Sequence, residues 1–199
     1  MINPVRLTKM CYSFKIVINT KMTKLLSRTP VHKGFFFTTY NDEVELLDGT
    51  TRVLDSGIRQ PSVGILPLTE NNEIILVDQY RYMLDKRIIE MASGMIDEGE
   101  DPLTAAKREL KEELGIVAKT WISLKTAVSA PSILTWENHI FVARDLAFEE
   151  QELETSEDIT MVKIPLADAV ERALNGEISH AVVSLAILVV NEKIKRGEL

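Results

Sequence analysis

Short hydrophobic runs separated by turn residues characterise the part of the chain that follows residue 33. The runs "FFFTTY", "EVELL" and "TRVLD" are divided by the dipeptides "ND" and "DG", which are typical of turns. This pattern predicts a small antiparallel sheet over residues 34–58. Residues 1–33 show no comparable pattern, so we assign them to an N-terminal extension, within which Met22 begins a segment that resembles an ordinary protein start.

A well-delimited helix follows a group of apolar strands. The segments "SVGILPL" and "EIILVDQYRY" predict two strands joined by a hairpin turn at "TENN", and "RIIEMAS" predicts a third strand. Asp101 is a favourable N-cap, Pro102 suits the first helical position, and Gly115 is suited to end a helix. These residues predict a helix over 102–114.

Strands also precede the last two helices. "TWISLKTAV" and "HIFVARDL" predict strands joined by the loop "SAPSILTWEN", and "ITMVKIPL" predicts a further strand. "PLADAVERALNG" predicts a helix that ends at Gly176, and "SHAVVSLAILVVNEKIKRG" predicts a last helix with Ser179 as its cap. The mixed order of strands and helices favours an α/β sandwich over a regular β–α–β array.

The composition restricts the classes of partner. The chain has 199 residues, 45% of them hydrophobic, and a net charge of −7 from 23 basic and 30 acidic side chains. A general nucleic-acid binder needs a basic surface, so we expect no nucleic-acid partner. The longest apolar segment, "AVVSLAILVV", is too short to cross a membrane, and the single cysteine, Cys11, excludes an intrachain disulfide. Since the N-terminus also lacks a signal-peptide pattern, we expect a cytoplasmic protein without a membrane partner.

Three glutamates gather on one side of the predicted helix. Each helical residue turns the chain by about 100°, so Glu109, Glu112 and Glu113 lie side by side. These carboxylates repel one another unless water or a cation neutralises them, and Mg²⁺ is often held by a few carboxylates together with substrate phosphates. Arg108 can pair with Glu112 or with Glu100 and so orient the cluster. A metal site and an ordinary solvated helix face both agree with this spacing.

The wider pattern resembles the Nudix box, Gly-x5-Glu-x7-Arg-Glu-U-x-Glu-Glu-x-Gly-U, in which U is a bulky aliphatic residue. Every specified position is matched, by Gly94, Glu100, Arg108, Glu109, Leu110, Glu112, Glu113, Gly115 and Ile116. The resemblance implies the Nudix α/β/α sandwich with a mixed sheet, which we assign to residues 59–199, behind the N-terminal sheet. It also implies a metal site on a loop–helix–loop segment.

The flanking segments narrow the resemblance. "VELLDGTTRVLDSGIRQPSVGILPL", "VDQYRY" and "EMASGMIDEGEDP" look like ADP-ribose pyrophosphatases and related nucleotide-sugar hydrolases, and Pro131 follows Gly115 by sixteen residues, as in many members of that branch. The resemblance implies metal-dependent hydrolysis of ADP-ribose, or of a related nucleoside diphosphate sugar, to a nucleoside monophosphate and a sugar phosphate. It also implies a homodimer in which the N-terminal sheet helps to build the partner's substrate site.

Two other functions agree with the same residues. A hydrolase of another nucleotide sugar, such as GDP-mannose, would use the same chemistry. A non-catalytic Nudix module that binds ADP-ribose would not need all the box carboxylates, so the intact box argues against this alternative.

The resemblance also assigns metal ligands and catalytic residues. Mg²⁺, or alternatively Mn²⁺, would be held by Glu109, Glu112 and Glu113 and by the backbone carbonyl of Ser93. Arg108 would orient the glutamates during catalysis, and Glu112 is a further candidate for a catalytic carboxylate.

Three polar residues outside the motif match positions near the substrate. Arg59 in "GIRQP" and Arg81 in "QYR" match positions that contact the substrate's phosphates or terminal ribose. Glu90 is a candidate polar residue of the same site. For each of the three, an ordinary surface charge is the alternative interpretation.

The loop "SAPSILTWEN" is where the resemblance implies a general base, which positions or deprotonates water. Glu137 is the natural candidate, and Pro131 belongs to the same substrate-binding loop. Ser132 stands where glycine is common, and the spacing from Pro131 to Glu137 is one residue longer than in the branch, so a box glutamate is the alternative base. Trp136 either stacks on the substrate or packs against the loop, and we expect His139 to be structural.

Overall fold

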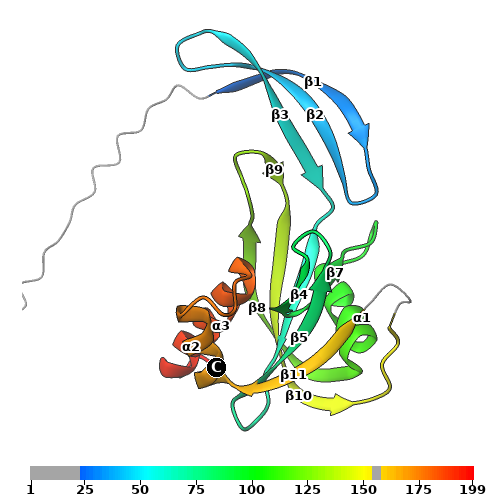
Figure 1. The fold of residues 1–199 in the computed structure, drawn as a ribbon, viewed down its shortest axis with the longest axis vertical. Coiled ribbons are helices and arrows are strands. Elements are labelled where there is room, and N and C mark those ends of the chain that lie inside the picture. Colours follow the sequence, from blue (N-terminus) through cyan, green and yellow to red (C-terminus); the bar gives the residue numbers. More distant parts are fainter. Residues whose placement is uncertain (1–22, 154–157) are drawn as a thin grey trace, which may run out of the picture.

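The computed structural model describes residues 23–153 and 158–199, which form layered sheets between helices and a further sheet that extends from one end (Figure 1). Our expectations for residues 1–22, including the start at Met22, lie outside the described residues.

The strands of the described residues form three sheets. The N-terminal sheet has the order β1-β2-β3-β9, with β1 at Lys24–Lys33, β2 at Phe37–Glu45, β3 at Thr51–Arg59 and β9 at Leu134–Thr135. The central sheet has the order β7-β4-β10-β8, with β7 at Ala92–Met95, β4 at Ser62–Pro67, β10 at Glu137–Phe148 and β8 at Ile116–Val128. The third sheet has the order β11-β5-β6, with β11 at Ile159–Pro165, β5 at Glu73–Arg81 and β6 at Lys86–Glu90. The helices are α1 at Pro102–Leu114, α2 at Leu166–Leu174 and α3 at Ala181–Lys195.

The central and third sheets carry apolar side chains on both faces, because consecutive strand residues point to opposite sides. In β4, Val63 and Ile65 pack in the core beneath α1, whereas Leu66, and Leu68 just after the strand, pack in the core beneath α2 and α3. Strands β5 and β10 divide their residues in the same way. The pairing of β10 is parallel with β4 and antiparallel with β8. The predicted α/β/α sandwich with a mixed sheet is therefore confirmed (Figure 1).

Helix α1 has the ends that the sequence predicts. The side chain of Asp101 accepts hydrogen bonds from the backbone N–H groups of Leu103 and Thr104, at 3.0 and 3.2 Å. Gly115 follows the helix with φ at 60°, in the left-handed region that glycine adopts without steric penalty. The cap and the glycine fix the two ends of α1, and its apolar residues, among them Leu110 and Leu114, pack in the core.

Two predicted elements are divided between sheets. The run "RIIEMAS" is interrupted at Met91, so β6 belongs to the third sheet and β7 to the central sheet. The turn at 69–72 also forms, but its flanking strands enter different sheets after one isolated bridge between Leu68 and Ile74. The local pattern reveals these strands, whereas their assignment to a layer depends on pairing with distant segments.

The N-terminal sheet differs from its prediction at two places. Strand β1, which we assigned to the extension, pairs with β2 as an edge strand and carries Pro30 next to an irregularity in the pairing. Proline lacks a backbone N–H and is tolerated only at sheet edges and bulges. A segment that contains it therefore does not read as a regular strand in the sequence. The predicted turn at Asn41 and Asp42 is wrong, because both residues lie within β2. The turn at Gly49 is confirmed.

The two C-terminal helices form where the sequence predicts them, with small differences at their ends. Helix α2 ends at Leu174 rather than at Gly176. In α3 the capping side chain is His180 and not Ser179, since Nδ1 of His180 accepts the backbone N–H of Val183 at 3.4 Å. Among the described residues, no helix combines the length and the apolar character that crossing a membrane requires.

A buried carboxylate holds the strands of the N-terminal sheet together. Asp42 of β2 accepts hydrogen bonds from Nε and Nη2 of Arg28 in β1 and from the hydroxyl of Ser56 in β3, all at 2.7 Å. The hydrogen bonds from the Arg28 guanidinium lower the pKa of Asp42 to about 2. These bonds explain how Asp42, a residue with turn chemistry, is accommodated inside a strand.

We predict that acid weakens the N-terminal sheet between about pH 4 and pH 2. A carboxylate with a lowered folded-state pKa stabilises the fold above its ordinary pKa, 3.8, and this contribution disappears as the pH falls toward 2. Hydrogen exchange of the β1 amides, corrected for intrinsic rates, should accelerate over this range. Asp42→Asn should exchange rapidly already at pH 5, whereas the exposed control Asp55→Asn should not. Unchanged protection in Asp42→Asn would contradict the role of this pair.

Candidate active site

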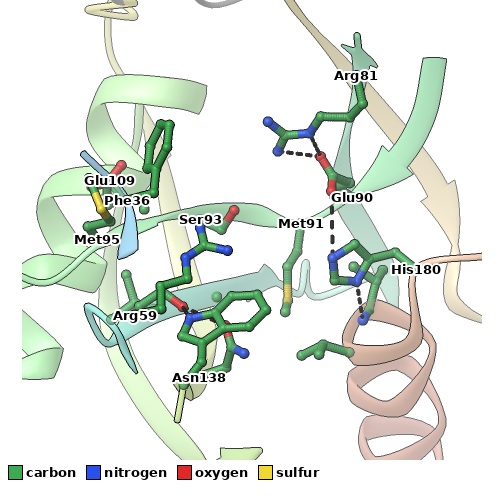
Figure 2. A pocket seen from close by; sticks show the side chains of 17 residues that line it. Phe36, Arg59, Arg81, Glu90, Met91, Ser93, Met95, Glu109, Asn138 and His180 are labelled. Carbon is green, nitrogen blue, oxygen red and sulfur yellow. Dashed lines mark hydrogen bonds and ion pairs between the residues drawn. The ribbon is translucent and has the colours of Figure 1, made fainter. Parts of the chain in front are cut away.

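A cleft of about 450 Å³ lies between the central sheet, α1 and the start of α3 (Figure 2). Seven residues that the sequence singles out line it together: Arg59, Arg81, Glu90, Ser93, Gly94, Glu109 and Trp136. Phe36, from the turn between β1 and β2, also lines the cleft. The N-terminal sheet therefore contributes to the cleft of its own chain.

Gly94 allows the carboxylate of Glu109 to pack directly against β7. A Cβ atom at Gly94 would overlap the carboxylate atoms of Glu109, so a larger residue would have to displace that side chain. Glu109 is buried and forms part of the cleft wall. The glycine that opens the motif thus sets how closely the strand and the helix approach each other.

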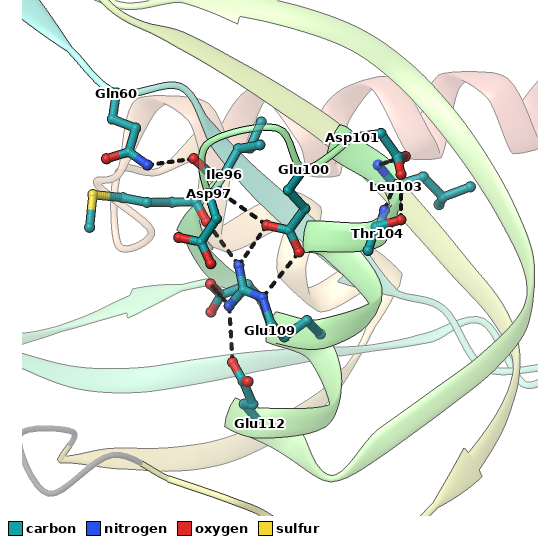
Figure 3. Close-up of polar contacts among 11 residues, drawn as sticks. Gln60, Ile96, Asp97, Glu100, Asp101, Leu103, Thr104, Glu109 and Glu112 are labelled. Carbon is teal, nitrogen blue, oxygen red and sulfur yellow. Dashed lines mark hydrogen bonds and ion pairs between the residues drawn. The ribbon is translucent and has the colours of Figure 1, made fainter.

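Arg108 lies at the centre of the acidic cluster. Its guanidinium donates hydrogen bonds to Glu100 at 3.2 and 3.0 Å, to Glu109 at 2.7 Å, to Glu112 at 3.2 Å and to the backbone carbonyl of Met95 at 3.0 Å (Figure 3). Both partners that the sequence predicts are present, and Glu109 is a third. The bonds between Arg108 and Glu100 are the largest cause of the raised pKa of Arg108 and of the lowered pKa of Glu100.

Glu113 connects the helix to the end of the strand before it. Its carboxylate is buried and accepts the backbone N–H of Ser93 at 2.9 Å. The residue that the resemblance implies as a backbone ligand, Ser93, is therefore held by one of the implied carboxylate ligands. Glu109 and Glu113, which are four residues apart on α1, both face β7.

The oxygen atoms at this end of the cleft suit a hard divalent cation. Among residues 23–153 and 158–199, no group of three or more His, Cys, Asp or Glu side chains is arranged so that it could hold a metal ion by itself. Mg²⁺ does not require one, because it is commonly bound by one or two carboxylates with water and substrate phosphates. Glu109, Glu113 and the Ser93 carbonyl offer this type of donor, so the residues fit such an ion.

A chain of ionic contacts forms the other end of the cleft (Figure 2). The buried carboxylate of Glu90 accepts a hydrogen bond from Nε of Arg81 at 2.7 Å and lies 3.6 Å from Nε2 of His180. Because Nδ1 of His180 accepts the backbone N–H of Val183, the neutral imidazole carries its proton on Nε2, toward Glu90. The sequence did not single out His180, since only the fold brings it to Glu90.

Arg59 stacks on the indole of Trp136, with its guanidinium carbon 4.1 Å from the ring centre. Burial, and secondly the positive charge of Arg81, lower the pKa of Arg59. Trp136 also donates its Nε1 proton to the hydroxyl of Ser62 at 3.1 Å and lines the cleft, so both predicted roles, packing and stacking on the substrate, stay open to it. Two guanidinium groups in one cleft favour an anionic ligand.

Five predicted site residues are not among those that line the cleft: Arg108, Glu112, Glu113, Pro131 and Glu137. Because Asn138 lines it, the preceding Glu137 points to the opposite face of β10. The carboxylate of Glu137 is 3.8 Å from Nε2 of His139 and its side chain is 56% exposed. Pro131 is exposed in the loop before β9, and Glu112 is bound to Arg108. This arrangement does not support Glu137 as the general base.

Comparisons with known proteins agree with the motif and the fold. A family model described as NUDIX domain matches residues 58–185. The chain is similar to an ADP-ribose pyrophosphatase of Mycobacterium tuberculosis (strain ATCC 25618 / H37Rv), with 31% identity over 83% of this chain and 82% of the relative. It is also similar to the ADP compounds hydrolase NudE of Escherichia coli (strain K12), with 30% identity over 86% and 92%. A crystal structure of an ADP compounds hydrolase matches with a TM-score of 0.79 and 28% identity, covering 90% of this chain and 98% of that structure.

We predict that Gly94→Ala lowers the free energy of unfolding by about 1–3 kcal/mol, because the added methyl must displace a carboxylate that Arg108 holds. Gly64→Ala is the matched control on the paired strand: its new methyl meets the end of the flexible Met91 side chain, which can shift. Denaturant unfolding of both variants would measure the difference. Equal losses would show that the Glu109 carboxylate adapts freely.

Proposed function

The chain belongs to the NUDIX domain family, and on this premise we propose that it hydrolyses the pyrophosphate bond of ADP-ribose or of a related nucleoside diphosphate sugar. The oxygen of a water molecule would form a bond to one phosphorus. The bond between that phosphorus and the bridging oxygen would break, and the bridging oxygen would leave with the other phosphate. ADP-ribose would thereby yield AMP and ribose 5-phosphate.

The observation that carries the proposal is the distribution of charge along the cleft. The box carboxylate Glu109 lies at one end, whereas the guanidinium groups of Arg59 and Arg81 belong to the same cavity. A polyanion with phosphates near Arg59 and Arg81 would leave its remaining negative charge near the box. A divalent cation there would compensate that charge. Relatives named ADP-ribose pyrophosphatase and ADP compounds hydrolase support this class of substrate.

Nudix hydrolases generally depend on a divalent metal, and we propose Mg²⁺, or Mn²⁺ in its place, for this chain. Glu109, Glu113 and the carbonyl of Ser93 would hold it, with Glu112 joining them when it leaves Arg108. When bound, such an ion neutralises phosphate oxygens and lowers the pKa of water. Arg108 would keep the carboxylates oriented, because its guanidinium already contacts Glu100, Glu109 and Glu112.

The proton of the attacking water needs a base near the box. We propose a box carboxylate, Glu109, because it lines the cleft and is buried beside Gly94. Glu137 remains the alternative from the sequence, and it would require a rearrangement of the loop at 129–136 to reach the cleft. Arg59 and Arg81 would hold the phosphates by charge-assisted hydrogen bonds.

We also propose that the chain forms a homodimer through the N-terminal sheet. This sheet extends away from the layered body (Figure 1), and it exposes apolar side chains on β1 and β3, among them Leu25, Val31, Val53 and Leu54. Contiguous exposed apolar surface commonly marks a protein–protein interface. An opposing copy would cover this surface, which the layered body leaves open to solvent.

We predict that Glu109→Gln and Glu113→Gln each lower kcat/KM for ADP-ribose by about 100-fold or more, because each removes a charge that would hold the metal. Removal of divalent ions with EDTA should abolish turnover, and added Mg²⁺ should restore it. Phosphate release coupled to alkaline phosphatase would measure these rates, with GDP-mannose, UDP-glucose and NADH as competing substrates.

Glu137→Gln separates the two candidate bases in the same assay. We expect it to keep kcat within about threefold of the wild type, since its carboxylate faces away from the cleft. A loss as large as that of Glu109→Gln would restore Glu137 as the base. If another nucleotide sugar is cleaved in preference to ADP-ribose, the assignment of the substrate changes and the proposed mechanism stays. Binding of ADP-ribose without cleavage of any substrate would favour the non-catalytic module.

We predict that Val53→Asp converts the dimer into a monomer, because it places a charge on an apolar side chain that is 65% exposed in the single chain. Leu174→Asp, an equally drastic change at a 66% exposed position of α2, is the matched control and should remain dimeric. Light scattering coupled to size-exclusion chromatography would give both masses. A monomeric wild type would refute the proposed assembly.

A further inference from the structure

Two buried side-chain nitrogen atoms lack a hydrogen-bond partner within the described residues, and both belong to the cleft. They are Nε of Arg59 and Nδ2 of Asn138. Buried donors are almost always paired in folded proteins, because an unpaired donor forfeits its hydration without compensation. Unpaired donors that share one cleft therefore indicate a group that arrives with the ligand.

The orientation of the Asn138 amide follows from its neighbours. Trp136 Nε1 can only donate, so the Ser62 hydroxyl accepts its proton at 3.1 Å. The one proton of Ser62 then goes to Oδ1 of Asn138, at 2.5 Å. This chain of two bonds holds the amide oxygen toward Ser62 and directs Nδ2, with both of its protons, to the other side.

Asn138 is buried and held by its neighbours, and only its Nδ2 lacks a partner. Only 7% of the residue is exposed, and Ser62 is also buried. Strand β10 pairs with β4 at this point, where Asn138 faces Ser62 in register. Nδ2 is buried without a partner and Asn138 lines the cleft, so we assign its partner to a group of the bound ligand. Figure 2 shows the amide on the wall between Arg59 and His180.

The neighbouring charges define the class of partner. Arg59 stacks on the Trp136 ring, and no described carboxylate accepts a hydrogen bond from its Nε. Arg81 adds a second positive charge to the cleft. Among the acceptors that could bond a neutral amide and cationic donors together, an anionic oxygen forms the strongest hydrogen bonds. In a nucleotide substrate, this oxygen belongs to a phosphate.

We infer that Asn138 is a specificity-determining residue that donates from Nδ2 to a phosphate oxygen of the bound nucleotide, with Ser62 and Trp136 as positioning residues. The inference rests on the proposed function for its substrate class. Nδ2 of Asn138 would be a neutral donor beside the charged residues of the cleft. Because its direction is set before the ligand binds, less side-chain entropy would be lost on binding.

Asn138→Asp tests this role with little change in shape. The variant keeps an oxygen for the Ser62 hydroxyl and replaces only the unpaired nitrogen, by an oxygen that repels phosphate. Asn138→Leu removes the donor without adding charge, in case a buried carboxylate prevents folding. Asn71→Asp is the matched control, because it makes the same amide-to-acid change in the exposed turn between β4 and β5.

The measurements are KM and kcat for ADP-ribose, and calorimetric binding of AMP and of adenosine, together with the melting temperature. We expect both Asn138 variants to raise KM and the Kd of AMP at least about tenfold, as for one hydrogen bond to a charged group. The affinity for adenosine should stay within about twofold, and Asn71→Asp should match the wild type. Ser62→Ala, which frees the amide to rotate, should give a smaller rise in KM.

A purely structural role predicts a different result: Asn138→Asp, which keeps the Ser62 bond, would bind AMP like the wild type, and this would overturn the inference. An equal loss of adenosine binding would also overturn it, because the partner would not be the phosphate. If the wild type binds AMP but cleaves no substrate, the proposed function falls, while a tenfold loss of AMP binding in the variants still supports Asn138. Failure of the wild type both to bind AMP and to cleave any substrate would overturn both, whereas cleavage of ADP-ribose with an unchanged KM in the Asn138 variants would overturn the inference alone.

Discussion

The hydrogen bonds of the Arg108 guanidinium are the interactions on which the structure of the motif depends. The guanidinium contacts Glu100, Glu109 and Glu112 and the carbonyl of Met95, so one cation holds the loop and the helix of the motif together. Without it, adjacent carboxylates on α1 would repel one another across a few ångströms. Gly94 is the steric counterpart, because its missing side chain leaves the space in which Glu109 is buried. The motif therefore contains its own charge compensation, through Arg108, as well as a set of possible metal ligands.

The pairing of Arg108 with the acidic cluster helps to explain how an acidic chain can bind an anionic substrate. Arg108 neutralises part of the cluster in the free protein, and a metal ion would take over that task when substrate arrives. Arg59 and Arg81 carry positive charge at the other positions of the cleft, while Glu90 balances Arg81 through a direct bond. Local charge in the cleft, and not the net charge of −7, determines which ligand fits.

The sequence predicts what depends on neighbouring residues. Helix α1, with Asp101 and Gly115 at its ends, and the strands buried on both faces follow from local chemistry and from the period of the apolar positions. Strand β1 was missed because an edge strand with Pro30 shows no regular alternation. The inward orientation of Asp42 requires Arg28 from another strand. Asn138 and His180 escaped notice because their partners lie far away along the chain, and Glu137 was favoured because a motif does not specify the face of a strand.

The N-terminal sheet meets the cleft at one junction, which gives the dimer proposal a consequence for binding. Strand β3 pairs in parallel with β9 at Gly57 and Leu134 and then at Ile58 and Thr135. The residues that follow these pairs are Arg59 after Ile58 and Trp136 after Thr135, and they stack on each other in the cleft. A ligand that orders Arg59 therefore also stabilises the junction from which the sheet extends. A partner that binds the sheet stabilises the same junction, and because coupling between two binding events is reciprocal, dimerisation and substrate binding should strengthen each other.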